Sequence, residues 1–339
     1  MDAVIEQAEA AGLSLREGFP LTVQATDRQR GLEQAFSVIR DQVDRRLERD
    51  GAILFSGFAD PGVEGFQAFA AAFGHPLLSY EFGSTPRSQV TGGGVYTSTE
   101  YPAHHSIPLH NEQAYTTEWP MRIWFYCARA ADEGGETPIA DSRRVYRRID
   151  PALRRRFEEK GLRYVRNYGN GLDVDWQQVF NSDDPAAVEA YCRRHRIDWV
   201  WKDDGTLRTS QRCQAVARHP RTGDRVWFNQ AHLFHVSALD PEMQEVLLET
   251  VGEADLPRNV YYGDGTPLES SALDVIRGVL DESRIVFPWQ TGDVLMLDNM
   301  LTAHARQPFR GPRKVVVAMA EGVSLESLEQ TAIPEAAHD

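Results

Sequence analysis

The chain has 339 residues, 42% of them hydrophobic and 25% charged, an ordinary balance for a globular protein with a large core. Its net charge of −14 argues against a nucleic-acid partner, and no apolar run reaches the length of a membrane span. Three widely spaced cysteines predict neither a disulfide framework nor a zinc site. With no secretory signal visible, we expect a cytoplasmic protein, whose oligomeric state the sequence leaves open.

The N-terminal part alternates helical and strand patterns. Residues 1–30 are expected to form a peripheral lead-in. Apolar residues on one face predict a helix over 31–50, followed by a buried strand at 52–55 and a helix at 66–73. Residues 75–106 are rich in Gly, Ser, Thr and Pro, which indicates long loops near a site.

The second half is predicted to be a mixture of strands and helices within a single domain, 1–339. The elements are a strand at 121–131, helices at 241–253 and 270–283, and strands from 285 to 319. Residues 142–215 begin basic and helical and then become polar, which predicts a helical and loop insertion that covers the site. Residues 322–339 are expected to form a loose acidic tail.

The most informative motif is His110-Asn111-Glu112, which follows a short apolar run. In a strand, residues two apart point the same way, so His110 and Glu112 would project together, with Asn111 on the other side. His304, after a strand-like segment far downstream, would complete a set of two imidazoles and one carboxylate. Such a set binds one face of an iron(II) ion and leaves positions open for a cosubstrate and O₂.

Other segments carry a wider pattern around this motif. They lie at 96–102 (Tyr-Thr-Ser-Thr-Glu-Tyr-Pro), 134–141, 227–229, 261–265 and 304–313. Together with the metal motif, they resemble the taurine dioxygenase-like superfamily of iron(II)/2-oxoglutarate-dependent oxygenases, and within it the SyrP-like branch of amino-acid hydroxylases. The resemblance runs from about Gly51 to Glu321. It implies a mixed α/β protein with a double-stranded β-helix, or jelly-roll, core and flanking helices.

The resemblance also implies roles for individual residues. His110, Glu112 and His304 would bind Fe(II), while Thr137 and Arg313 would bind 2-oxoglutarate, which is consumed together with O₂. Glu112 favours hydroxylation over halogenation, because related halogenases replace this carboxylate with a small residue so that chloride can bind the iron.

The implied substrate is an amino acid, hydroxylated at an unactivated carbon during the synthesis of a specialised peptide. Candidate substrate contacts are Arg87, Thr97, Ser98, Glu100, Asn111, Asn229 and Arg306. Glu100 could accept from an ammonium group, and Arg87 or Arg306 could hold a carboxylate. The substrate is either free or presented by a peptidyl carrier protein. Basic segments at 143–156 and 192–196 are a candidate docking surface for an acidic carrier, and a solvated helix face explains them equally well.

Alternatives stay open at this point. The same cofactors could support a desaturase or a cyclase acting on a free amino acid or small peptide. A non-catalytic jelly-roll binding protein would keep the fold without the reaction, and a zinc hydrolase could use the same three ligands. Four other histidines are possible decoys: His104, His105, His232 and His235. His104 and His105 are adjacent and would face opposite ways in a strand, and His232 and His235, at helical spacing, have no accompanying carboxylate triplet.

Overall fold

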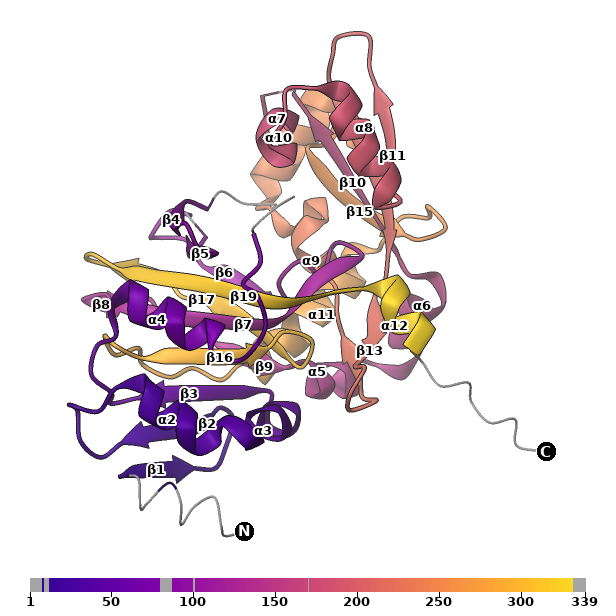
Figure 1. The fold of residues 1–339 in the computed structure, drawn as a ribbon. Helices are drawn as coiled ribbons and strands as arrows, with labels where there is room; N and C mark the ends of the chain where they lie inside the picture. Colours follow the sequence, from indigo (N-terminus) through magenta and orange to yellow (C-terminus); the bar gives the residue numbers. More distant parts are fainter. Residues whose placement is uncertain (1–7, 9–11, 80–86, 100, 170, 332–339) are drawn as a thin grey trace.

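The largest sheet of the protein has eight strands. The structure, a computed structural model, describes residues 8, 12–79, 87–99, 101–169 and 171–331 (Figure 1). In spatial order the strands are β1 (Leu13–Arg16), β2 (Leu21–Ala25), β3 (Ala52–Ser56), β16 (Val294–Asp298), β7 (Glu118–Arg129), β19 (Lys314–Ser324), β5 (Val95–Thr97) and β4 (Gln89–Thr91). Neighbours are antiparallel except β2 and β3, which are parallel. The strands predicted at 52–55 and 121–131 are confirmed as β3 and β7.

A three-stranded sheet faces the large one and carries both histidines of the predicted metal site. Its order is β6 (Ile107–His110), β17 (Thr302–Arg306) and β9 (Ile139–Asp141). The ring centroid of Phe125, on β7, lies 4.9 Å from that of His304, on β17, so the two sheets meet at this point. A short ribbon of β8 (Glu133–Gly134) and β18 (Phe309–Arg310) lies at one end. The two facing sheets form the predicted jelly-roll core.

The central strand β7 is buried on both faces, which explains its nearly continuous apolar sequence. Ile123, Phe125 and Cys127 point into the space between the sheets. Trp124 and Tyr126 point the other way, into a core shared with three helices. These helices are α2 (Leu32–Ile39), α3 (Val43–Asp50) and α4 (Gly62–Ala71). The single helix predicted over 31–50 is therefore two helices, separated by the 3₁₀ turn η1 (Arg40–Gln42).

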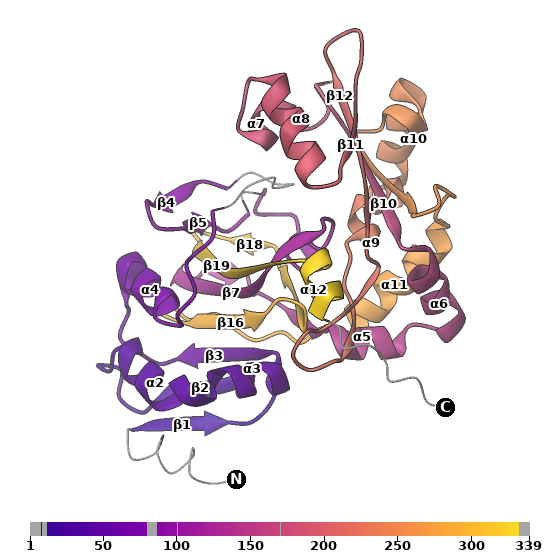
Figure 2. The ribbon, with the colours of Figure 1, turned by 45° about the vertical axis from the view of Figure 1, so that its right-hand side comes forward.

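A second lobe stands apart from the large sheet (Figures 1 and 2). Its sheet has the order β11 (Asp198–Trp201), β12 (Leu207–Cys213), β10 (Leu162–Tyr168) and β15 (Arg258–Tyr262), with α7 (Trp176–Phe180), α8 (Pro185–Arg194) and α10 (Pro241–Val251) around it. The predicted insertion at 142–215 thus contains three strands that the sequence reading missed. In β12 the alternation is hidden, because Thr209 and Gln211 occupy buried positions where apolar side chains would have revealed a strand.

The remaining elements connect the lobe to the jelly roll. They are α5 (Ser142–Arg148), α6 (Pro151–Lys160), β13 (Val216–Arg218), β14 (Arg225–Trp227), α9 (Ala231–Phe234), η2 (Val236–Ala238), η3 (Glu253–Asp255) and α11 (Ser270–Ser283). Helix α11 matches the helix predicted at 270–283. It packs against α5 and α9, and so supports the three-stranded sheet from outside.

The described residues near the two ends of the chain form regular elements that the sequence did not indicate. Within the predicted lead-in, β1 and β2 extend the large sheet and bury Leu13, Leu21 and Val23. Within the predicted tail, β19 continues to Ser324 and α12 (Leu325–Thr331) follows, while 332–339 lie outside the described residues. In the described part of the chain, no helix is long and apolar enough to cross a membrane.

Candidate active site

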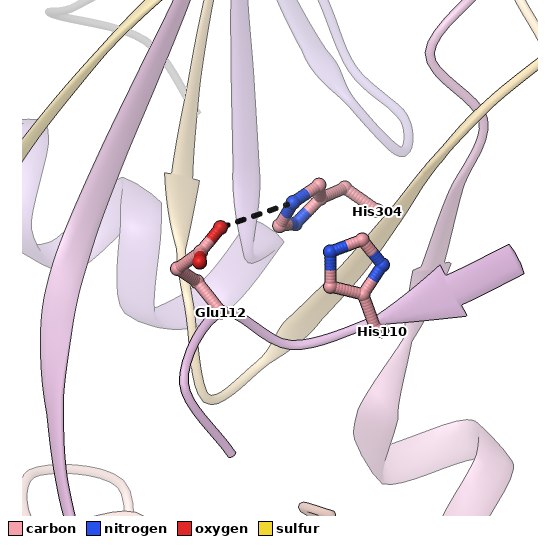
Figure 3. A group of neighbouring side chains, drawn as sticks. All are labelled: His110, Glu112 and His304. Atoms are coloured by element: carbon pink, nitrogen blue, oxygen red, sulfur yellow. Dashed lines mark ion pairs between the residues drawn. The ribbon is translucent and has the colours of Figure 1, made fainter. Parts of the chain in front are cut away.

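His110, Glu112 and His304 converge between the two sheets. His110 and His304 are directly opposed on the paired strands β6 and β17, with ring centroids 4.5 Å apart. One ligand atom from each of the three side chains lies within 4.8 Å of the others, and Nε2 of His304 is 3.9 Å from a Glu112 carboxylate oxygen (Figure 3). Within the described residues, this is the one group of His, Cys, Asp or Glu side chains arranged to hold a metal ion.

Both imidazoles are held neutral. Burial lowers the pKa of His110, and it places the pKa of His304 well below its usual range. Nδ1 of His110 lies 2.8 Å from the Pro108 carbonyl oxygen, which assigns the ring proton to Nδ1 and leaves Nε2 with a lone pair for a metal. Two neutral nitrogens and one carboxylate are the donor set that suits Fe(II), so the residues fit the ion.

Asn299 sets the position of Glu112. Strand β6 ends at His110, so strand alternation does not extend to Glu112 as the sequence reading assumed. Instead, the Asn299 side chain accepts from the backbone N–H of Glu112 (2.8 Å) and donates to its carbonyl oxygen (2.9 Å). The same amide donates to the carbonyl of Pro120, and the Asn299 carbonyl accepts from the Asn111 side chain (2.6 Å). Asn299 is therefore a positioning residue for the carboxylate ligand.

We expect Asn299→Ala to weaken Fe(II) or Mn(II) binding by about 10- to 100-fold, the usual cost of losing a group that orients a metal ligand. Metal titration of the purified variant measures this. Asn229→Ala is the matched control, because Asn229 is equally buried and donates to the Ala215 carbonyl (2.7 Å) without touching a ligand. Equal losses of metal affinity in both variants would show that Asn299 has no specific role.

A small cavity adjoins the metal cluster and is lined by cationic side chains. His110, His304, Thr137 and Arg313 line it together. Among the described residues in its wall, three are arginines and none is Asp or Glu. The cavity is therefore positively charged even before a metal binds, and the two residues predicted to bind 2-oxoglutarate lie in the same wall as His110 and His304.

Arg313 is held in place by Gly135. Its Nε donates to the Gly135 carbonyl (2.9 Å), and its guanidinium lies over the Phe309 ring. Gly135 has φ +75°, and a Cβ there would come within 3.0 Å of the Arg313 side chain, so the arginine needs glycine at this turn. Burial, together with the charge of Arg306, lowers the pKa of Arg313 to about 10, which leaves it charged at neutral pH. Within the described residues, no carboxylate forms an ion pair with Arg313, whose side chain lines the cavity.

Trp289 orients the Thr137 hydroxyl. The indole Nε1 donates to the Thr137 oxygen (2.7 Å), so the hydroxyl proton is directed elsewhere and can be donated to a carboxylate in the cavity. Thr137 is 3% exposed and Trp289 is 9% exposed. Thr137 could be predicted from the sequence, but Trp289 could not, because no local sequence pattern marks a single tryptophan so far along the chain.

We expect Trp289→Phe to raise the KM for 2-oxoglutarate about 3- to 10-fold, as loss of one neutral hydrogen bond typically does. Because phenylalanine keeps most of the buried ring, metal affinity should change little. The matched control is Trp201→Phe, which removes an indole hydrogen bond to Glu189 in the lobe, 3.0 Å long. A KM unchanged in Trp289→Phe would remove this tryptophan from the cosubstrate site.

Comparison with known proteins identifies the arrangement. The family model described as "Taurine catabolism dioxygenase TauD, TfdA family" matches residues 17–319. This chain belongs to the TauD/TfdA family. It is 42% identical over 301 residues to the dapdiamide synthesis protein DdaC of Enterobacter agglomerans, which covers 89% of this chain and 91% of DdaC.

Other relatives agree with this placement in the TauD/TfdA family. The chain is 32% identical over 298 residues to a clavaminate synthase-like protein of Arabidopsis thaliana, covering 85% and 87% of the two chains. Its fold is similar to that of PvcB, an Fe, alpha-ketoglutarate dependent oxygenase from an isonitrile synthetic pathway, with a TM-score of 0.54, 14% identity and coverage of 92% and 93%. The predicted superfamily and fold are thereby confirmed. The chain is a non-heme iron(II)/2-oxoglutarate-dependent dioxygenase, and its cofactors are Fe(II), 2-oxoglutarate and O₂.

Some predicted substrate contacts of this TauD-family enzyme lie at the cavity. Arg87, Ser98 and Arg306 line it. The Arg306 guanidinium, however, donates to the backbone carbonyls of Tyr101, Pro102 and His105, at 2.7–2.8 Å. Arg306 therefore holds the loop beside the cavity. Glu100 lies outside the described residues.

The other predicted contacts belong to the framework. The Asn111 amide donates to Ser142 and to the Asn299 carbonyl, and Asn229 binds the backbone at Ala215 and Ala231. The Thr97 hydroxyl accepts from the backbone N–H of Ser88 (2.9 Å). These contacts give no support to Asn111, Asn229 or Thr97 as substrate ligands.

The alternative histidines and the basic segments have other roles. His232 lies 2.8 Å from the Leu109 carbonyl oxygen, His235 caps η2 through Ser237, and His104 and His105 are exposed. In the basic segments, several arginines are paired with acids: Arg143 with Asp141, Arg148 with Glu282, Arg156 with Glu269 and Arg196 with Glu326. These ion pairs reduce the positive charge of the candidate docking surface, while the carrier-protein role stays a prediction.

Proposed function

We propose that this dioxygenase hydroxylates an unactivated carbon of an amino acid in the synthesis of a specialised peptide. The observation that carries the proposal is the Glu112 carboxylate, held against two neutral imidazoles beside an arginine-lined cavity. A protein carboxylate here would occupy the coordination position that a halide needs. Similarity to DdaC, a protein of dapdiamide synthesis, supports a role in specialised metabolism and an amino-acid-related substrate.

The protein's own contribution is to position the reactants and keep water away. Bound Fe(II), with 2-oxoglutarate and O₂, supplies the oxidising power needed to take hydrogen from an unactivated carbon. His110, Glu112 and His304 would hold the ion. Arg313 would pair with the distal carboxylate of 2-oxoglutarate, and Thr137 would donate to it. The side chains of Glu112 and His304 are 6% and 5% exposed, so water has little access to the metal position.

Labelled oxygen and mass spectrometry test the proposal. Free amino acids and aminoacyl carrier proteins are screened for substrate-dependent succinate formation, and the products are analysed after reaction under ¹⁸O₂. We expect a gain of one labelled oxygen atom, even in high chloride. A chlorinated product would contradict hydroxylation, and a loss of two hydrogens would instead indicate desaturation or cyclisation by the same cofactors.

A further inference from the structure

Arg87 forms a buried ion pair with Glu112 in the candidate active site. Its guanidinium donates to Oε2 of Glu112 at 2.6 Å, and the two side chains are only 3% and 6% exposed. The backbone just beyond Arg87 is anchored, because Ser88 and Thr97 exchange two hydrogen bonds of 2.9 Å. The arginine therefore reaches the metal ligand from a fixed base just before β4.

The contact uses the carboxylate oxygen that faces the histidines. Oε2 of Glu112 is also the atom 3.9 Å from Nε2 of His304. Arg87 also lines the same small cavity as His110 and His304, so the guanidinium lies beside the histidine pair. Arg87 thus provides the positive charge for Glu112 where a metal ion would provide it.

A divalent ion and this guanidinium cannot share the oxygen without a large electrostatic cost. Both are cations, and an arginine cannot lose its proton to relieve the repulsion. When the metal takes Oε2, the guanidinium has to move away from it. Arg87 already forms part of the wall of the adjoining cavity, together with Ser98 and Thr99, so the cavity is the side toward which the guanidinium would turn.

We infer that Arg87 exchanges partners when the metal binds. In the metal-free protein it neutralises Glu112, and once the ion is bound it turns to hold a carboxylate of the organic substrate. This inference rests on the proposed function for the identity of the substrate, but not for the exchange between metal and arginine. Arg306 is committed to three backbone carbonyls, and Arg313, held by the Gly135 carbonyl, is the proposed partner of 2-oxoglutarate. Of the three cavity arginines, Arg87 is the one that forms an ion pair with a residue of the metal cluster, Glu112.

Two consequences follow from this exchange. By linkage, the metal raises the affinity for the substrate anion, and the anion raises the affinity for the metal by the same factor. The substrate must also carry a free carboxylate. An amino acid joined to a carrier protein through its carboxyl group has lost that charge, so the inference favours a free acid.

Mn(II) binding tests the exchange without any knowledge of the substrate. Wild type, Arg87→Gln and Arg87→Lys are titrated with Mn(II), followed by electron paramagnetic resonance of the free ion, and the Tm of each is measured with and without metal. Arg87→Gln should bind Mn(II) about tenfold more tightly than wild type, because no cation competes for Oε2. Its metal-free form should melt at a lower temperature, and Mn(II) should restore the Tm. Arg87→Lys should resemble wild type.

The matched control is Arg310→Gln, whose side chain is 84% exposed and outside the cavity. It should bind Mn(II) as wild type does. Unchanged or weaker Mn(II) binding in Arg87→Gln would overturn the exchange, because Arg87 would then support the ligand rather than compete with the metal.

Substrate recognition is tested separately. Turnover of each active amino acid or peptide is compared with that of its carboxyl amide and of its carrier-bound thioester. The free acid should react at least about tenfold faster, and Arg87→Gln should abolish this preference while keeping the visible absorption band of anaerobic Fe(II) with 2-oxoglutarate. Equal turnover of acid and amide, or turnover confined to thioesters, would overturn the carboxylate assignment. A wild-type protein without the absorption band would instead contradict the proposed function and leave the Mn(II) result standing.

Discussion

His110→Ala, Glu112→Ala and His304→Ala should each lose substrate-dependent succinate formation by more than about a hundredfold. Losing even an outer partner of a metal ligand costs about 10- to 100-fold in affinity or activity, and these three side chains are the proposed ligands themselves. Succinate release and the iron content of each purified variant measure the loss.

A control separates ligand loss from general damage. His75→Ala removes a histidine whose side chain is 35% exposed and whose neighbour is Glu321, away from the cluster. It should keep both its iron and its activity. Normal turnover in any one of the three ligand variants would remove that residue from the metal site.

Arg313→Ala should raise the 2-oxoglutarate requirement by tens- to thousands-fold and change iron affinity much less. Truncating one partner of a buried charge pair costs about 2–5 kcal/mol, which corresponds to that range of affinity. The guanidinium is anchored through Gly135 and faces a cavity whose described wall has no acidic residue, so a ligand carboxylate is its natural partner. The KM for 2-oxoglutarate and a metal titration together give the result.

Arg310→Ala is the matched control for this prediction. Arg310 lies three positions earlier, is exposed and contacts Glu133, so its loss should leave the KM unchanged. If Arg310→Ala or Arg306→Ala raised the KM and Arg313→Ala did not, the assignment of the cosubstrate arginine would be wrong.

Local patterns predicted the jelly-roll strands well because burial on both faces leaves long apolar runs, as in β7. They predicted α11 because its apolar residues repeat at helical spacing and are buried. The lobe sheet was missed because its buried positions include Thr209 and Gln211, whose polarity hides the alternation. Polar side chains at such positions are satisfied by tertiary hydrogen bonds, such as Gln211 to the His195 carbonyl (2.9 Å), and a local pattern cannot reveal these.

In the site, too, residues marked by a local sequence pattern could be predicted, and contacts between distant segments could not. His110 and His304 could be found because each lies on or beside an apolar strand. The geometry of Glu112 could not be derived from its own segment, because it depends on Asn299, 187 positions away. Likewise, the contact between Arg87 and Glu112 and the orientation of Thr137 by Trp289 join residues from separate segments. The separation of two residues along the sequence does not predict such contacts.

The lobe sheet is separate from the two jelly-roll sheets, and this separation has a consequence for how such enzymes diverge. In the described part of the chain, the strands of the lobe pair only with one another, and none joins the strands that carry the metal cluster. Lobe and jelly roll meet instead through side chains, such as Gln211 with Thr117 and Cys213 with the carbonyl oxygen of Tyr115. A chimera that exchanges the lobe between relatives would therefore leave the hydrogen-bonded ladders around the metal cluster intact. It would have to preserve the hydrophobic core that Leu162 and Tyr164 of the lobe share with Leu109 and Ala305 of the jelly roll.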